Sequence, residues 1–198
     1  FNFHEIKPKS LAINFKEDKS NIFIKNLEIA SHVVNDIFND SNFPDLNGDL
    51  LINCLESFKM PPGRGEILSL NKFKIIDDSY NANPESVKAA LDHLSGFQEC
   101  RKFFVFGDMK ELGANEEILH KKVGQYAVGK TDILLTVGKL AKNAQSNSNN
   151  FALSLHFNDN FSLLEKLNEL LTDGDIVLIK GSRSMQLDQL INELKNVK

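Results

Sequence analysis

RKFFVFGD, residues 101–108, is the stretch that decides the fold of this 198-residue chain. Apolar residues run through it without the polar alternation of a half-exposed strand, which is typical of a strand buried on both faces. Such strands occur in parallel sheets that helices cover on both sides. We therefore expect an α/β domain to be built around this segment.

Segments of strand character alternate with segments of helical spacing on both sides of residues 101–108. This alternation predicts right-handed crossovers and a Rossmann-like, mostly parallel sheet with helices on both faces. Residues 151–157 alternate more than the other strands, so we expect them nearer an edge of the sheet. The expected strands are 66–70 and 73–78 (a hairpin), 101–108, 132–138, 151–157 and 174–181, and the expected helices are 84–97, 115–129, 160–171 and 184–195, with a short helix beginning near residue 138.

The first 60 residues have a different organisation. They contain short strand-like and helix-like segments that do not complete a domain, and MPPGRG (60–65) reads as a linker. We predict that residues 1–60 are the trailing part of an upstream α/β domain with a hinge, and that residues 61–198 form one domain. The chain begins with Phe1 rather than Met, so we expect it to be a piece of a longer protein.

Composition excludes several classes of function. The formal net charge of −4, without a block of Lys and Arg, gives no general attraction for nucleic acid. Cys54 and Cys100 are far apart, which favours free thiols in a reducing compartment over a disulfide framework. The five histidines show no metal-site spacing. No apolar run approaches the roughly 20 residues that span a bilayer, so we expect no membrane insertion.

Three polar stretches follow expected strands: DDSYNANP (77–84), GDMKELG (107–113) and KGSRS (180–184). Ligands of an open parallel sheet bind beyond the carboxyl ends of its strands, where loops and helix N-termini converge. A single parallel sheet places all three stretches at one edge. We therefore expect the functional site there.

The first two stretches also have simpler interpretations. Asn83 before Pro84 is a good helix start, so on that ground Asn83 is a cap. Capping does not explain Tyr80 and Asn81, or the paired Asp77 and Asp78. Amide side chains offer both a donor and an acceptor, as recognition of a base edge or a ribose requires. GDMKELG, taken alone, is better read as a plain loop.

Two further segments favour an anion. Lys180 and Arg183 flank small residues at an expected strand end and helix start, which suits a carboxylate or phosphate as well as it suits a solvated basic pair. Arg64 lies between two glycines in GRGE (63–66), from where it can reach a phosphate unless this segment is only a flexible linker. The chain has no GxxxxGK[ST], GxGxxG or GxSxG motif. These features predict half of an active site.

Four motifs in order resemble the C-terminal domain of the Mur ligase family: GRGE, IIDDSYNANPESVKAAL, FVFGDMKELG with LHKKVGQYA, and DIVLIKGSRSM. The resemblance covers residues 61–198. Residues 1–60 are only weakly similar to the end of the family's central ATPase domain.

The resemblance implies an ATP-dependent, ADP-forming ligation through an acyl phosphate, in the cytoplasmic synthesis of peptidoglycan precursors. The motifs are most similar to those of the member that joins D-alanyl-D-alanine to UDP-N-acetylmuramoyl-tripeptide. In the family the P-loop and Mg²⁺ belong to the central domain. The resemblance therefore implies that this fragment alone is inactive. It implies no obligate protein partner, and it assigns no catalytic side chain to these residues.

The resemblance also implies two sets of site residues. The nucleotide-binding set is Arg64, Asp78, Tyr80, Asn81, Asn83 and Pro84. The set facing the incoming dipeptide and the reacting centre is Asp108, Glu111, Leu112, Lys180, Ser182 and Arg183, with the dipeptide carboxylate near Arg183. Two alternatives stay open: a related amide ligase, such as a folylpolyglutamate synthetase or a single-amino-acid Mur ligase, and a non-catalytic Rossmann-like binding module.

Overall fold

The computed structural model describes residues 29–30, 33 and 61–196. The chain divides into two compact units, Phe1–Lys59 and Met60–Lys198, and the second contains the β-sheet and the helices that pack on it. The expected strands and helices before residue 60 lie outside the described residues, apart from the helical residues 29, 30 and 33. The assignment of residues 1–60 to an upstream domain stays a prediction.

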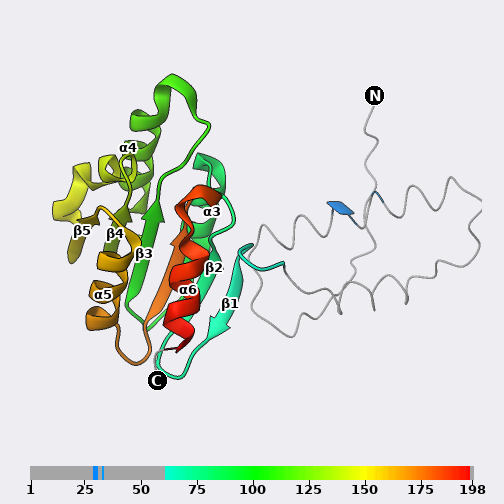
Figure 1. The fold of residues 1–198 in the computed structure, drawn as a ribbon, viewed down its shortest axis with the longest axis vertical. Helices are drawn as coiled ribbons and strands as arrows, with labels where there is room; N and C mark the ends of the chain where they lie inside the picture. Colours follow the sequence, from blue (N-terminus) through cyan, green and yellow to red (C-terminus); the bar gives the residue numbers. More distant parts are fainter. Residues whose placement is uncertain (1–28, 31–32, 34–60, 197–198) are drawn as a thin grey trace, which may run out of the picture. The chain divides into compact units, whose positions relative to one another are not determined.

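Six strands form one mixed sheet with the order β1-β2-β6-β3-β4-β5 (Figure 1). β1 pairs with β2 in the antiparallel sense, and all other neighbours are parallel, which confirms the predicted hairpin and the mostly parallel sheet. β5 lies at the edge, as its alternating pattern indicated. The strands are β1 (Glu66–Ser69), β2 (Lys74–Asp78), β3 (Lys102–Gly107), β4 (Ile133–Val137), β5 (Leu153–Phe157) and β6 (Ile176–Lys180).

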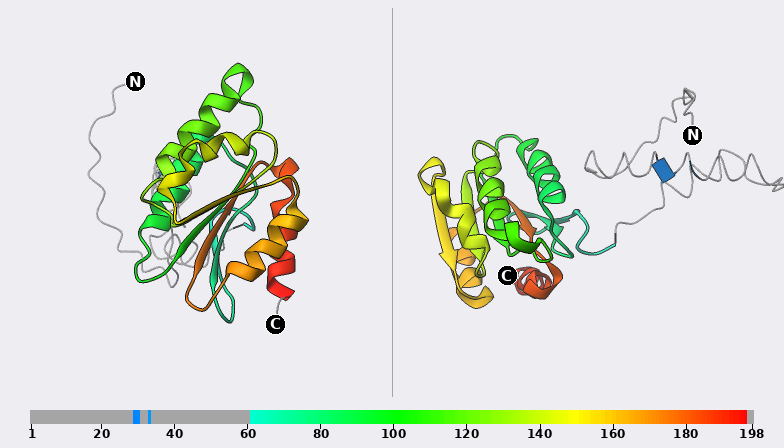
Figure 2. Two further views of the ribbon diagram at one scale, coloured as in Figure 1. Left: turned by 90° about the vertical axis from the view of Figure 1, so that its left-hand side faces the viewer. Right: turned by 90° about the horizontal axis from the view of Figure 1, so that it is seen from above.

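Helices cover both faces of the sheet, as predicted (Figure 2). Phe104 and Phe106 of β3 belong to one core cluster, whereas Phe103 and Val105 belong to the other, so the buried strand supplies both layers. The first cluster includes α3 (Pro84–Ser95), α4 (Glu116–Ala127) and the 3₁₀ helix η2 (Ala141–Asn150), and the second includes α5 (Asn160–Leu170) and α6 (Leu187–Asn196). Among the residues that the structure describes, no helix is long and apolar enough to cross a membrane.

The last helix begins later than its sequence pattern predicted. Residues Arg183–Met185 form a separate 3₁₀ turn, η3, and Gln186 follows in the left-handed region with φ of 52°. α6 therefore starts at Leu187, so Arg183 does not lie in its first turn. The expected short helix after residue 138 is the 3₁₀ helix η2, and a second 3₁₀ turn, η1 (Gly113–Asn115), precedes α4.

The carboxyl ends of the central strands lie level with one another. Lys180 at the end of β6 pairs in register with Asp78 of β2 and with Phe106 of β3. Gly107 at the end of β3 pairs with Val137 of β4. The three polar stretches predicted to form a site therefore leave the sheet together, at its carboxyl edge.

Candidate active site

The polar side chains of the segment after β2 form hydrogen bonds within that segment. Buried Asp77 accepts hydrogen bonds through Oδ1 from the Ser79 amide (3.2 Å) and the Ser79 hydroxyl (2.6 Å). Asn83 caps α3: its Oδ1 accepts from the Ser86 amide at 2.8 Å, while Ser86 Oγ accepts from the Asn83 amide at 3.2 Å. The capping interpretation of Asn83 is confirmed, and Pro84 occupies the first turn of α3.

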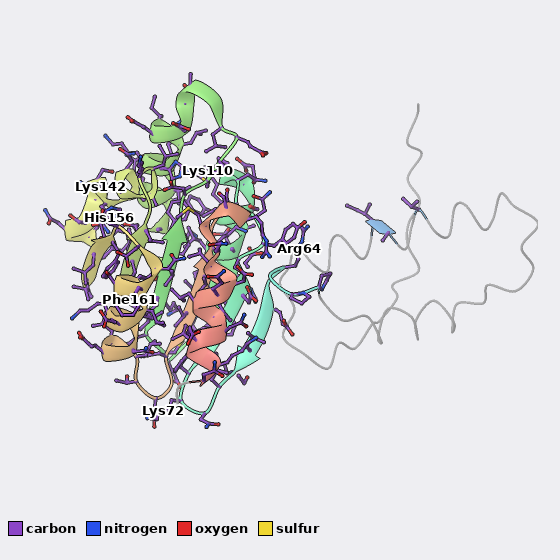
Figure 3. All side chains as sticks on the ribbon, in the orientation of Figure 1. Arg64, Lys72, Lys110, Lys142, His156 and Phe161 are labelled. Carbon is purple, nitrogen blue, oxygen red and sulfur yellow. The ribbon has the colours of Figure 1, made fainter. Side chains whose placement is uncertain are left out.

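Arg64 and Tyr80 form a stacked pair at the start of this segment (Figure 3 labels Arg64). The Arg64 guanidinium carbon lies 4.0 Å from the centre of the Tyr80 ring, which is 44% exposed. The Tyr80 amide donates to the Gly63 carbonyl at 3.0 Å, and the Gly65 amide donates to the Asp77 carbonyl at 2.7 Å. The GRGE segment is therefore hydrogen-bonded to the end of β2 and to Tyr80, and exposed Asn81 follows Tyr80 in the sequence.

Lys180 joins the KGSRS segment to the loop after β2. Its side chain is only 2% exposed, and Nζ donates to Asp78 Oδ2 at 2.6 Å and to the Asn81 carbonyl at 2.9 Å. Burial lowers the pKa of Lys180, and Asp78 opposes that effect. The ammonium group thus holds Asn81 and Asp78 in place from inside the molecule.

Ser182 joins the KGSRS segment to the loop after β3. Its amide donates to the Asp108 carbonyl at 2.9 Å, and its hydroxyl accepts from the Lys110 amide at 2.8 Å. The three stretches that sequence analysis singled out therefore form one hydrogen-bonded unit, with KGSRS in the centre.

Asp108 connects this unit to a fourth loop, residues 138–141, which sequence analysis missed. Oδ1 of the buried carboxylate accepts from the Leu140 amide (2.9 Å) and the Ala141 amide (2.8 Å), while Oδ2 accepts from Lys110 Nζ (2.9 Å). Burial alone would raise the pKa of Asp108, but these hydrogen bonds hold it below its usual range. Gly138, directly after β4, was the residue in the sequence that could have indicated this loop.

Gly138 is required by this arrangement. Its φ is +105°, and an added Cβ would lie 2.5 Å from Asp108 Oδ1 and 2.8 Å from Met185 Cε. Any larger residue would displace the carboxylate that organises the fourth loop.

His120 of α4 holds the loop after β3 in place, and the sequence analysis did not identify it. Its Nε2 accepts from the Met109 amide at 2.8 Å, and Nδ1–H donates to the Glu116 carbonyl at 2.6 Å. The side chain is fully buried, and burial lowers its pKa. A lone histidine in a helical pattern gives no sequence signal for such a role.

The remaining candidates lie at the rim of the unit. Exposed Arg183 pairs with Asp188 Oδ2 at 2.9 Å, so its guanidinium is engaged at the start of α6. Glu111 is exposed and has a left-handed φ of 63°, whereas Leu112 is partly buried against the core. Within residues 61–196, no group of three His, Cys, Asp or Glu side chains is placed to hold a metal ion.

Known proteins are similar to this chain in sequence and in fold. Residues 63–183 match the family model described as "Mur ligase, glutamate ligase domain". The UDP-N-acetylmuramoyl-tripeptide–D-alanyl-D-alanine ligase of Bacillus subtilis (strain 168) is 35% identical over 149 residues, covering 71% of this chain and 32% of the relative. The ligase of the same name from Rickettsia prowazekii (strain Madrid E) is 32% identical over 140 residues, covering 70% of this chain and 31% of the relative.

A solved structure shares the fold. It is the MurF ligase from Thermotoga maritima in complex with ADP, with a TM-score of 0.65 and 26% sequence identity; the match covers 73% of this chain and 33% of that one. The chain thus spans about a third of the length of the relatives that it matches. Motifs, loop geometry and family model agree, and the chain belongs to the Mur ligase family.

Proposed function

We propose that the full-length protein carrying this domain is an ADP-forming ligase that joins D-alanyl-D-alanine to UDP-N-acetylmuramoyl-tripeptide in the cytoplasm. The observation that carries the proposal is the hydrogen-bonded unit at the carboxyl edge, in which the family motifs around Asp78, Asp108 and Lys180 meet. The names of the relatives supply the substrates. The acting protein is the whole ligase, of which this chain is a C-terminal part.

The loop after β2 is the proposed nucleotide side of the site. The stacked Arg64 and Tyr80 offer a flat cationic surface for the nucleotide and its phosphates. Asn81 Oδ1 accepts from the Ala82 amide at 2.8 Å, which leaves its amide hydrogens for a base or ribose oxygen. Asp78, Asn83 and Pro84 hold the backbone of this loop in shape. The related Thermotoga maritima structure, solved with ADP, supports a nucleotide as ligand.

The proposed reaction has two steps. ATP transfers its terminal phosphoryl group to the carboxylate of the tripeptide, giving ADP and an acyl phosphate. The amine of D-alanyl-D-alanine then attacks the acyl carbon, the tetrahedral intermediate loses phosphate, and the amine loses a proton as the amide forms. Such a reaction depends on positioning and on stabilisation of charge. Asp108, Glu111, Leu112, Lys180, Ser182 and Arg183 form the proposed surface facing the reacting centre and the dipeptide.

The P-loop and Mg²⁺ are assigned to the upstream domain in this proposal. Mg²⁺ would neutralise phosphate charge there. Residues 1–60 are proposed to be the end of that domain and a hinge. We expect no ligation by this chain on its own.

Phosphate release by the full-length protein tests the proposal. ATP, Mg²⁺ and the nucleotide-linked tripeptide are supplied with D-alanyl-D-alanine, with single amino acids, with glutamate, or with no acceptor. Release that depends on D-alanyl-D-alanine is the expected result. Release driven by glutamate or a single amino acid would assign the protein to another amide ligase. No release with any acceptor would favour a non-catalytic binding module.

A further inference from the structure

The fourth loop leads to a second polar cluster at the carboxyl edge, over β4 and β5. Lys142 lies in the first turn of η2, and His156 lies near the end of β5, in register with Thr136 of β4. The charge of Lys142 acts on His156, so the two side chains are neighbours, and Figure 3 labels both on the side of the domain away from Arg64. Lys142 is exposed, and within residues 61–196 it has no carboxylate partner. Burial and the charge of Lys142 both lower the pKa of His156.

The ring of His156 is fixed by one of its nitrogens. Nδ1 lies 3.0 Å from the Thr136 hydroxyl, which accepts a hydrogen bond from Gln145 Nε2 at 3.0 Å. The Leu155 carbonyl lies farther from the same hydroxyl, at 3.5 Å, so the Thr136 proton is best placed on His156 Nδ1. The neutral ring then carries its own hydrogen on Nε2, and no described side chain accepts it.

Three cations of this edge are paired with acidic side chains, whereas Arg64 stacks on Tyr80 and Lys139 in the fourth loop is exposed. Lys180 pairs with Asp78, Lys110 pairs with Asp108, and Arg183 pairs with Asp188. The charge of Asp108, in the neighbouring loop, favours a higher pKa of His156. That charge is compensated by Lys110 and by two backbone amides. The surroundings of Lys142 and His156 therefore favour a small anion.

The position of this cluster matches the length of a dipeptide. Adjacent strands are about 4.8 Å apart, so β5 lies roughly 10 Å from β3, where the proposed reacting centre faces Asp108. One residue spans about 3.5 Å and two span about 7 Å. A dipeptide whose amine is at the centre can bring its carboxylate to a side chain that reaches inward from η2 or β5. A single amino acid leaves about 3.5 Å more for the side chain to span.

We propose that Lys142 and His156 bind the terminal carboxylate of the incoming dipeptide and thereby select a dipeptide over a single amino acid. This inference rests on the proposed ligase function. Lys142 supplies the charge, and His156 Nε2–H supplies an oriented donor. Arg183, which is held by Asp188, is then a rim residue rather than the carboxylate site.

The test compares D-alanyl-D-alanine with D-alanyl-D-alaninamide, which lacks the anionic carboxylate, as substrates of the full-length protein. We expect the native protein to prefer the acid by about tenfold or more in kcat/KM. Lys142→Gln should abolish this preference by raising the KM for the acid, with the KM for ATP unchanged. His156→Gln should reduce it in part. Lys195→Gln, at the end of α6, is the matched control and should keep the native preference.

The outcomes separate the inference from the function on which it rests. If the native protein shows no release dependent on D-alanyl-D-alanine, the ligase proposal itself fails. If it does, but it uses acid and amide equally, or Lys142→Gln keeps the native preference, the carboxylate site is overturned.

Discussion

Lys180 Nζ lies 2.6 Å from Asp78 Oδ2, and the two residues stand opposite each other in the register of β6 and β2. Lys180 is 2% exposed and Asp78 is 20% exposed, so the cation is the more deeply buried partner. Because a charge leaving water needs a counter-charge, the pair fixes the loop after β2 rather than offering a free cation to solvent.

Asp78→Asn should destabilise the domain by about 3 kcal/mol, because it leaves the Lys180 ammonium buried without a counter-charge. Urea unfolding monitored by circular dichroism measures the change. Asp188→Asn breaks the exposed pair with Arg183 and should cost less than about 1 kcal/mol. Equal effects of the two substitutions would show that burial does not govern the Lys180 pair.

Asn81→Ala should weaken the use of ATP by the full-length protein while leaving the fold intact. The loss of a hydrogen bond to the nucleotide corresponds to roughly a two- to tenfold rise in the KM for ATP. Steady-state kinetics give the KM, and thermal unfolding reports the fold. Asn149→Ala, at an exposed position in η2, should change neither. Native ATP kinetics in Asn81→Ala would remove Asn81 from the proposed nucleotide site.

Gly138→Ala should destabilise the domain more than Gly129→Ala. Both glycines have positive φ, but an added Cβ meets Asp108 Oδ1 at 2.5 Å in the first case and nothing within 4 Å in the second. Backbone strain of roughly 1 to 3 kcal/mol applies at both sites, and at Gly138 the larger φ and the clash with Asp108 both add to it. Denaturant unfolding of both variants provides the measurement, and matching midpoints would contradict the role given to Gly138.

His120 should make the domain sensitive to acid. Burial lowers its pKa in the folded state, so the unfolded chain binds the extra proton first as the pH falls below about 6.5. Stability should therefore decrease on acidification, with a contribution of at most about 1.4 kcal/mol per pH unit from this residue. Protonation would also place an N–H against the Met109 amide.

Urea unfolding of native protein and His120→Gln between pH 5 and 8 isolates this contribution. The variant is expected to be less stable at pH 8, but its stability should change less with pH. Parallel pH profiles would mean that His120 is not the group that titrates.

The sequence was informative where a pattern depends on local chemistry. Continuous apolar runs predicted the buried strands, and Asn83 before Pro84 predicted a capped helix start. Parallel pairing then required the loops after β2, β3 and β6 to meet. The link of the fourth loop to the site is made by backbone amides of Leu140 and Ala141, which carry no residue-specific signal, so Gly138 was the residue that could have indicated it.

Side-chain direction was the other limit. The pattern KGSRS indicated two free cations, but which way Lys180 points depends on the register between β6 and β2. Arg183 was expected at a helix start, and the left-handed Gln186 separates it from α6. Neither the register nor that backbone conformation follows from residue types.

The hydrogen bonds of GRGE to β2 and Tyr80 bear on how Arg64 is placed. The Gly63 carbonyl accepts from the Tyr80 amide in the loop after β2, the Gly65 amide donates to the Asp77 carbonyl in β2, and an added Cβ at Gly63 would lie 3.0 Å from the Tyr80 nitrogen. Arg64 is therefore carried as part of the rigid domain. Pro61 and Pro62, whose rings fix φ, directly precede this bonded segment. In the proposed ligase, Arg64 would therefore meet the nucleotide together with Tyr80 and not as an independently moving side chain of a linker.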